Sequence, residues 1–409
     1  MDFEQTRTEN DEQLLSQTDL IKSAENIQVL IPFAKAYLGM FYVIESDLAA
    51  KEKVRLLANE ELAEAIFKGF LSILNRDDLP SLEEIGHKAA EKKEYAEGYV
   101  VLAGLDLLVK NNITEINELN LSLIEKAVAF HFSNKSGFKN IWFDYLLEKN
   151  FEKAIPAICR YWVAMLKNKT SYLPGNYLVL GDKANSKAIE YCLLPLLENW
   201  SGCKVKILVQ LLHLAFKYSE ASELLNVCER VLINDESLNE KTRLYWIVAA
   251  YLTSPDKYFA KLTDYVGRVK LKVMPLLDFV ILILQDKNDI NININTKIII
   301  QLLRITAPVF PPQHHVYGAL GVLDINSKNV MLLFYFLVCS NEKDITSELK
   351  KLRKARVMKI YSGVIDNVLK LHIRKNNDAH FIMPDFEGYI EMLVKNNCLQ
   401  GRSNKFDLR

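Results

Sequence analysis

Apolar residues recur at spacings of three and four along nearly the whole chain, and this period constrains the possible folds more than any other feature. Over residues 47–74, for example, Val54, Leu62 and Phe70 share one broad stripe of an expected helix. Strict alternation of apolar and polar residues, the pattern of a half-buried strand, is confined to residues 290–294. The 409 residues include only 15 Gly and 11 Pro, which favours helices over turn-rich sheets. The sequence therefore predicts an all-α protein.

The expected helices follow one another closely along the chain. Ser81 and Glu84 form the pattern of a capping box, in which the hydroxyl accepts from the third amide and the carboxylate reaches back to the cap residue. The segments with a helical period are about 47–74, 95–110, 120–132, 140–149, 151–168, 184–199, 203–217, 220–233, 240–252, 255–268, 271–286, 296–305, 328–340, 345–375 and 385–396.

Short links between these segments predict the architecture. Links of a few residues make neighbouring helices pack antiparallel, and a helix pair that cannot bury its apolar face alone stacks on the next pair. Three successive pairs within residues 203–305 recur at about 30 to 40 residues, a spacing typical of HEAT and tetratricopeptide arrays. No tetratricopeptide signature repeats. We therefore expect an irregular, HEAT-like α-solenoid of antiparallel helix pairs with about fifteen helices.

Three parts are expected along the chain. They are an acidic N-terminal helical segment at 1–80, a HEAT-like solenoid at 81–307, and a Pro-rich loop followed by C-terminal helices with a basic face at 308–409. Two irregular loops interrupt the helices, at 170–182 and 308–324, and long loops of this kind often carry binding function. The expected interaction residues of the second loop are Pro311, Pro312, His314, His315 and Tyr317.

The cellular setting is predicted from the apolar segments and the cysteines. The acidic start does not match a secretory signal, and the most apolar stretches, 273–284 and 330–338, are shorter than the roughly 20 residues that a bilayer needs. We therefore expect a cytoplasmic protein without a membrane partner. The six cysteines are scattered and form no CxxC pair, which predicts free buried thiols and neither a disulfide nor a zinc site.

The sequence contains no pattern that dictates a chemistry. It has no nucleophile elbow, no P-loop and no dinucleotide-binding glycine motif. The adjacent His314 and His315 lack a third ligand at helical spacing, so packing in the loop is the simpler interpretation. We therefore expect no enzyme, no cofactor and no metal. The tryptophans are expected to be core anchors between helix pairs, and they are Trp142, Trp162, Trp200 and Trp246.

Charge is balanced in sum, with 51 Lys and Arg against 51 Asp and Glu, but it is unevenly distributed. Residues 1–64 hold 13 acids against 6 bases, and residues 350–375 hold nine bases against Asp366 alone. The second cluster predicts contact with phosphates or with an acidic partner, and the alternative is that these bases form an ordinary solvated helix face. The candidate contacts are Lys350, Lys351, Arg353, Lys354, Arg356 and Lys359. The expected inward stripe beside them is Leu352, Val357, Ile360, Val364, Val368 and Leu371.

Packing and turn positions occur in a recognisable order over residues 79–409. They include the run Ala103 to Leu108, residues 141–162 and 172–197, and TRLYWIVAAYLTSPDKYFAKLTDYV at 242–266. Later positions are Phe310, Pro311, Pro312, Gly321, Val322, Phe381, Pro384, Leu399, Gly401, Asn404, Asp407 and Leu408. This order resembles the helical C-terminal region of bacterial NACHT and related STAND-type NTPases, which are associated with anti-phage defence.

The resemblance implies a sensing or assembly arm beside a nucleotide-binding domain, and it carries no catalytic residues. This chain contains neither the P-loop module nor a recognisable effector, so a free-standing arm, a subunit of a split system and a fragment all remain open. The sequence thus predicts a non-enzymatic interaction or sensing scaffold whose partner is another protein, such as an NTPase or effector subunit. The alternative is a nucleic-acid-binding helical-repeat protein that uses residues 350–375. A third possibility, an enzyme whose site is assembled from distant helices, also stays open.

Overall fold

The regular elements of the computed structural model are helices, and no strand occurs among the residues that it describes. This confirms the predicted all-α class. The chain divides into two units, Met1–Leu196 (unit 1) and Leu197–Arg409 (unit 2). The described residues are 13–41, 44, 47–134, 141–175, 192–234, 238–286, 294–311, 322–340, 345–377 and 380–396, with side chains from 325 onward in the range that begins at 322.

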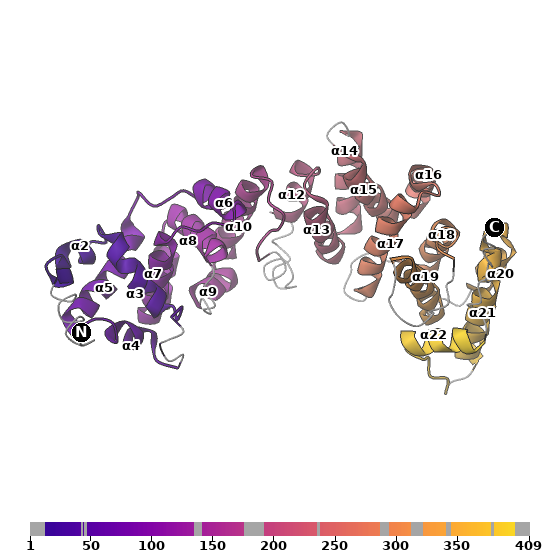
Figure 1. Ribbon diagram of the computed structural model, residues 1–409. Coiled ribbons are helices and arrows are strands. Elements are labelled where there is room, and N and C mark those ends of the chain that lie inside the picture. The colour runs from indigo at the N-terminus through magenta and orange to yellow at the C-terminus, as the bar shows by residue number, and fades with distance from the viewer. Residues whose placement is uncertain are drawn as a thin grey trace, which may run out of the picture. The chain divides into compact units, whose positions relative to one another are not determined.

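Unit 1 is built from helices that pack mainly against near neighbours in the chain, such as α5 on α7 and α8 on α10 (Figure 1). Its elements are α2 (Thr18–Lys22), α3 (Ile27–Tyr37), α4 (Ala50–Arg55), α5 (Glu60–Ser72), η1 (Ile73–Asn75), α6 (Leu82–Ala90), α7 (Glu97–Asn111), η2 (Ile113–Glu118), α8 (Leu121–Ser133), α9 (Ile141–Lys149) and α10 (Phe151–Lys167). The short α12 (Leu194–Asn199) follows at the division between the units.

The helix expected at 47–74 is divided in the structure, and this corrects the prediction. The side chain of Asn59 accepts a hydrogen bond of 2.9 Å from the backbone N–H of Leu62 and starts α5 as a separate helix. The capping box at Ser81 is confirmed. The Ser81 hydroxyl accepts from the N–H of Glu84 at 3.2 Å, and the Glu84 carboxylate accepts from the N–H of Ser81 at 2.8 Å.

Unit 2 also packs through helices that are close in sequence, with α15 against α13, α14, α16 and α17, and α19 against α17, α18, α21 and α22 (Figure 1). Its elements are α13 (Val205–Tyr218), α14 (Ala221–Ile233), α15 (Glu240–Thr253), α16 (Pro255–Val266), α17 (Lys270–Gln285), α18 (Thr296–Thr306), α19 (Val322–Cys339), α20 (Ile345–Lys354), η6 (Arg356–Tyr361), α21 (Ser362–Asn377) and α22 (Phe386–Lys395). Contacts between near neighbours are what a repeat array requires. The stacking of all pairs into one solenoid, and the three parts at 1–80, 81–307 and 308–409, stay predictions.

The prediction of a single helix at 345–375 is also wrong, because η6 separates α20 from α21. Met358 and Tyr361 are both fully buried, and residues three apart lie on one side of a 3₁₀ helix. The hydroxyl of Tyr361 donates to the backbone carbonyl of Phe310. The 3₁₀ turn thus places both side chains in the core.

Three tryptophans anchor the core as predicted. Trp142, Trp162 and Trp246 are at most 1% exposed. The indole N–H of Trp246 donates to the carbonyl of Ser201 at 3.0 Å, which satisfies the polar end of an otherwise buried ring. Trp200 is only half-buried, so the expectation of a full core anchor does not hold at that position.

The cysteines depart from the prediction of free thiols at one pair. Cys159 of α10 and Cys192, just before α12, form a disulfide with Cα atoms 5.8 Å apart. The two residues are 33 positions apart in the chain, and only the tertiary structure brings them together. Cys203, Cys228 and Cys339 carry free thiols. Burial raises the pKa of the Cys203 thiol to about 12, so that thiol is protonated and unreactive near neutral pH.

No helix in the described ranges is long and apolar enough to cross a membrane.

Candidate functional site

The basic segment of unit 2 presents cations and apolar side chains together. Lys350 and Lys354 of α20 and Arg356 and Lys359 of η6 are exposed. Among them lie two aliphatic side chains of η6, Val357 at 39% and Ile360 at 51% exposed. We call this set, Lys350, Lys354, Arg356, Val357, Lys359 and Ile360, the basic–aliphatic surface.

Two of the six predicted cationic contacts are neutralised by neighbours on their own surface. Lys351 lies 2.6 Å from the carboxylate of Glu348 and lowers its pKa. Arg353 binds Asp366 through two nitrogens, one of them at 2.9 Å, and this contact raises the pKa of the guanidinium. The other four, which belong to the basic–aliphatic surface, form no ion pair with any residue that the structure describes.

The two aliphatic side chains correct the predicted inward stripe. Leu352, Val364, Val368 and Leu371 are buried as expected, whereas Val357 and Ile360 are not. The reason is the change of period, because the 3₁₀ turn directs Met358 and Tyr361 inward and leaves the residues before them outside. A sequence signal did exist, since Met358 and Tyr361 form an alternative apolar pair three residues apart.

The predicted interaction loop lies mostly outside the described residues, which is where Pro312, His314, His315 and Tyr317 fall. Pro311 is exposed. Its carbonyl accepts a hydrogen bond of 2.9 Å from the hydroxyl of Ser327 in α19. The structure therefore places the start of this loop against α19 and does not test the histidine pair.

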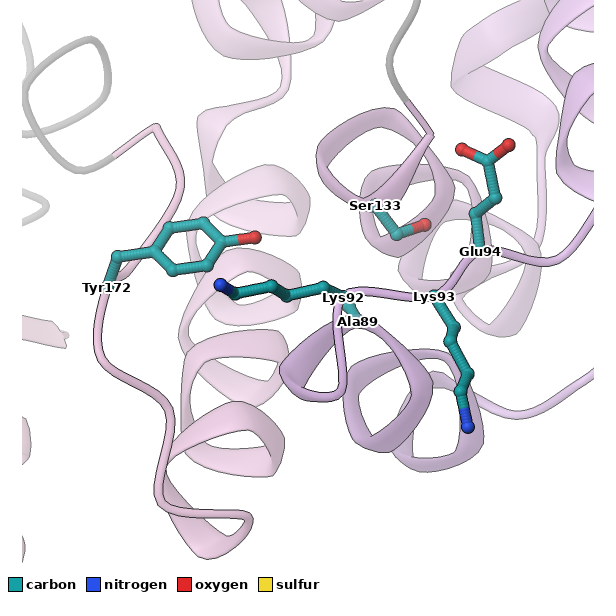
Figure 2. A pocket seen from close by; sticks show the side chains of 6 residues that line it. All are labelled: Ala89, Lys92, Lys93, Glu94, Ser133 and Tyr172. Atoms are coloured by element: carbon teal, nitrogen blue, oxygen red, sulfur yellow. The ribbon is translucent and has the colours of Figure 1, made fainter.

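A polar pocket of about 470 Å³ lies in unit 1, where α6 ends, and sequence reasoning did not predict it. Figure 2 shows the ammonium of Lys92 and the phenol of Tyr172 directed toward each other across it. Lys93 points elsewhere and binds Glu91 at 2.9 Å. The lining residues are Ala89, Lys92, Lys93, Glu94, Ser133 and Tyr172.

The described part of unit 1 contains two ionisable side chains that are largely withdrawn from solvent, the half-buried His131 and the buried Asp106. His131 stacks on Phe143 with ring centroids 4.1 Å apart, and burial lowers the pKa of its imidazole to about 4. Asp106 is 1% exposed and lies 2.6 Å from the ammonium of Lys110. Across the described ranges, no group of three or more His, Cys, Asp or Glu side chains is arranged to hold a metal ion.

Comparisons with known proteins bring no further assignment: no family model, no curated protein and no solved structure matches this chain.

Proposed function

We propose that this protein is a non-enzymatic, cytoplasmic interaction scaffold whose basic–aliphatic surface binds an acidic, amphipathic segment of a partner protein. The observation that carries the proposal is the mixture of groups on that surface. Unpaired cations at Lys354, Arg356 and Lys359 accompany the exposed Val357 and Ile360. Exposed aliphatic side chains are common on protein surfaces, so the proposal rests on the position of these two among four cations that form no ion pair with the described residues.

The two kinds of group contribute different parts of the binding energy. Burying aliphatic surface yields roughly 25 cal/mol per Å² and supplies affinity without direction. The cations add long-range attraction and choose an acidic partner over a basic one. A complementary segment therefore carries carboxylates around one or two apolar side chains.

The resemblance to the C-terminal regions of NACHT and STAND-type NTPases supports a more specific form of the proposal. In that form the chain is an arm or subunit of a bacterial defence or signalling assembly, and the partner is its NTPase or effector subunit. This part rests on the packing and turn positions at 79–409 alone.

Nucleic acid is the second candidate, and the same four cations favour it. Bases of a single strand usually stack on exposed aromatic side chains. The aromatic residues of α20, η6 and α21 are Tyr361 and His372, and both are buried. An acidic protein partner therefore accounts for more of the surface than nucleic acid does.

The experiment compares capture of partners from the native cell by the wild-type chain and by three variants, with quantitative mass spectrometry as the readout. The first variant reverses Lys350, Lys354, Arg356 and Lys359 to Glu. The second is Ile360→Asp. The matched control reverses Lys204, Lys206, Lys241 and Lys270, which are also exposed in unit 2, and so changes the net charge equally.

We expect a protein with an acidic apolar segment to be lost from both test variants and kept by the control. A purified segment of that partner should then bind the wild-type chain at least tenfold more tightly than Ile360→Asp. Identical capture by all four proteins contradicts the proposal. Binding of DNA or RNA at low salt that is lost on charge reversal but kept in Ile360→Asp would instead establish the nucleic-acid alternative.

A further inference from the structure

The pocket at the end of α6 contains two exposed hydrogen-bond donors that no other described residue engages. The ammonium of Lys92 and the phenol of Tyr172 face each other across it (Figure 2). Neither side-chain group forms an ion pair or a hydrogen bond with a described residue. The neighbouring charges are already satisfied, since Lys93 binds Glu91 at 2.9 Å and Glu94 accepts from the hydroxyl of Tyr99 at 2.8 Å.

The segment that carries Tyr172 is attached firmly to the helices around it. The indole N–H of Trp162 donates to the carbonyl of Pro174 at 3.0 Å, and the hydroxyl of Thr170 donates to the carbonyl of Tyr172 at 2.9 Å. Gly175 has φ +70°, and a Cβ there would lie 2.2 Å from the ring of Phe132. The phenol is therefore presented by a fixed backbone, in one of the two irregular loops that the sequence singles out.

Lys92 occupies a backbone position that glycine usually takes. It has φ 63° and ends α6 in a Schellman motif, in which its N–H donates to the carbonyl of Ala89 and the N–H of Lys93 donates to that of Lys88, both at 2.9 Å. A side chain in this conformation is unfavourable compared with glycine. Lysine near a helix C-terminus also complements the helix dipole, so a separate comparison must isolate the role of the pocket.

Lys169 supplies that comparison, because it ends α10 in the same way. It has φ 53°, its N–H donates to the carbonyl of Leu166 at 2.9 Å, and it does not line the pocket. Any benefit that comes from the helix end alone applies to both lysines. A benefit that comes from a ligand applies to Lys92 alone.

We propose that this pocket binds a small ligand through an anionic oxygen group, a carboxylate or a phosphate, held between the ammonium of Lys92 and the phenol of Tyr172. A volume of about 470 Å³ suits a small organic molecule or the end of a peptide. The hydroxyl of Ser133 donates to the side-chain oxygen of Asn134 at 2.8 Å, so its own oxygen is left to accept from the ligand. The ligand therefore carries an anionic group at one end and a hydrogen-bond donor near the other.

The test is calorimetric titration of the full chain at constant ionic strength, with chloride as the reference anion. The probes are inorganic phosphate, sodium acetate, and a short peptide with either a free or an amidated C-terminus. Saturable binding of phosphate or acetate identifies a free small anion as sufficient. Binding of the peptide only when its carboxylate is free identifies a chain end as the source.

Four variants test whether binding occurs at this pocket. Lys92→Gln should weaken binding about tenfold or more, because the positive charge is lost. Tyr172→Phe should also weaken it about tenfold, because a hydrogen bond to a charged group is lost. Lys92→Gly should abolish binding while raising the midpoint of thermal unfolding, whereas Lys169→Gly should raise the midpoint and leave binding intact.

No saturable binding of any probe, or equal binding by wild type and Lys92→Gln, overturns the proposal. Neither result bears on the basic–aliphatic surface, which belongs to unit 2 and is tested with other variants.

Discussion

His131 places an imidazole among aromatic rings. Its ring lies 4.1 Å from that of Phe143 and 5.7 Å from that of Trp142, measured between centroids. Burial disfavours the charged form, which lowers the pKa to about 4 from an ordinary value of 6.5. The folded chain therefore binds a proton on this residue less readily than the unfolded chain does.

From this difference we expect stability to decrease as the pH is lowered through a defined window. As the pH is lowered from about 6.5 to about 4, this residue should reduce the free energy of unfolding by at most about 3 kcal/mol. The reason is that the unfolded state takes up the proton first. His131→Phe should flatten the dependence in that window. Urea unfolding at several pH values measures it, and equal slopes for wild type and variant would contradict the burial of a neutral imidazole.

At the scale of the helices, two close approaches decide which residue can stand at the point of contact. A Cβ on Gly104 of α7 would lie 2.1 Å from the backbone carbonyl oxygen of Phe70 in α5, and one on Gly69 would lie 2.3 Å from that of Ile21. Both contacts are with backbone, which cannot rotate away as a side chain can. Glycine is therefore required at these positions for the approach of the helices.

Gly104→Ala should destabilise unit 1 by at least about 2 kcal/mol, because the helices must separate to admit the methyl group. An exposed helix position behaves in the opposite way, since alanine has a helix propensity about 1 kcal/mol better than glycine. Asn111→Ala, at the exposed end of the same helix, serves as the control and should change stability little. Chemical denaturation followed by circular dichroism measures both, and similar midpoints for the two variants would contradict the close approach.

The disulfide joins α10 to the chain just before α12 and closes a loop with a sequence separation of 33. A cross-link of this length stabilises a protein by about 3 to 4 kcal/mol, through the entropy of the unfolded chain. Cys159→Ser and Cys192→Ser should each lower the free energy of unfolding by that amount. The double variant should lower it no further. Unfolding midpoints together with alkylation of non-reduced protein measure the effect. Alkylation of both cysteines without reductant would show that the bond does not form under the chosen conditions, as in a reducing cytosol.

At the scale of the whole molecule, charge is the property with measurable consequences. The chain has equal numbers of acids and bases and an isoelectric point of about 7.0. A protein without net charge has little repulsion between copies. Local clusters such as the basic–aliphatic surface therefore act against a neutral background.

Solubility should consequently be lowest near pH 7 and should rise on either side. Reversal of Lys350, Lys354, Arg356 and Lys359 to Glu should move the minimum to a lower pH, because the variant becomes acidic. Precipitation by ammonium sulfate across pH values measures this. A minimum that stays at the same pH would show that a local patch, and not net charge, governs association.

The period of apolar residues was sufficient to predict most helices within a few residues. The segments expected at 151–168, 203–217, 240–252 and 271–286 correspond to α10, α13, α15 and α17. Burial of one helix face against neighbours is a local requirement that a single chain segment already reveals. The capping box at Ser81 is local in the same way, since both hydrogen bonds join residues three apart.

By itself, then, the sequence determined the helical class, most helix positions, the cationic residues of unit 2 and the irregular loop after α10. The tertiary structure alone decided which of those residues meet. The partners of the Cys159–Cys192 bond, the facing pair of Lys92 and Tyr172, and the exposure of Val357 and Ile360 depend on contacts between segments or on a change of helical period. Spacing along the chain encodes the face of a helix, but it does not encode which distant face that helix will meet.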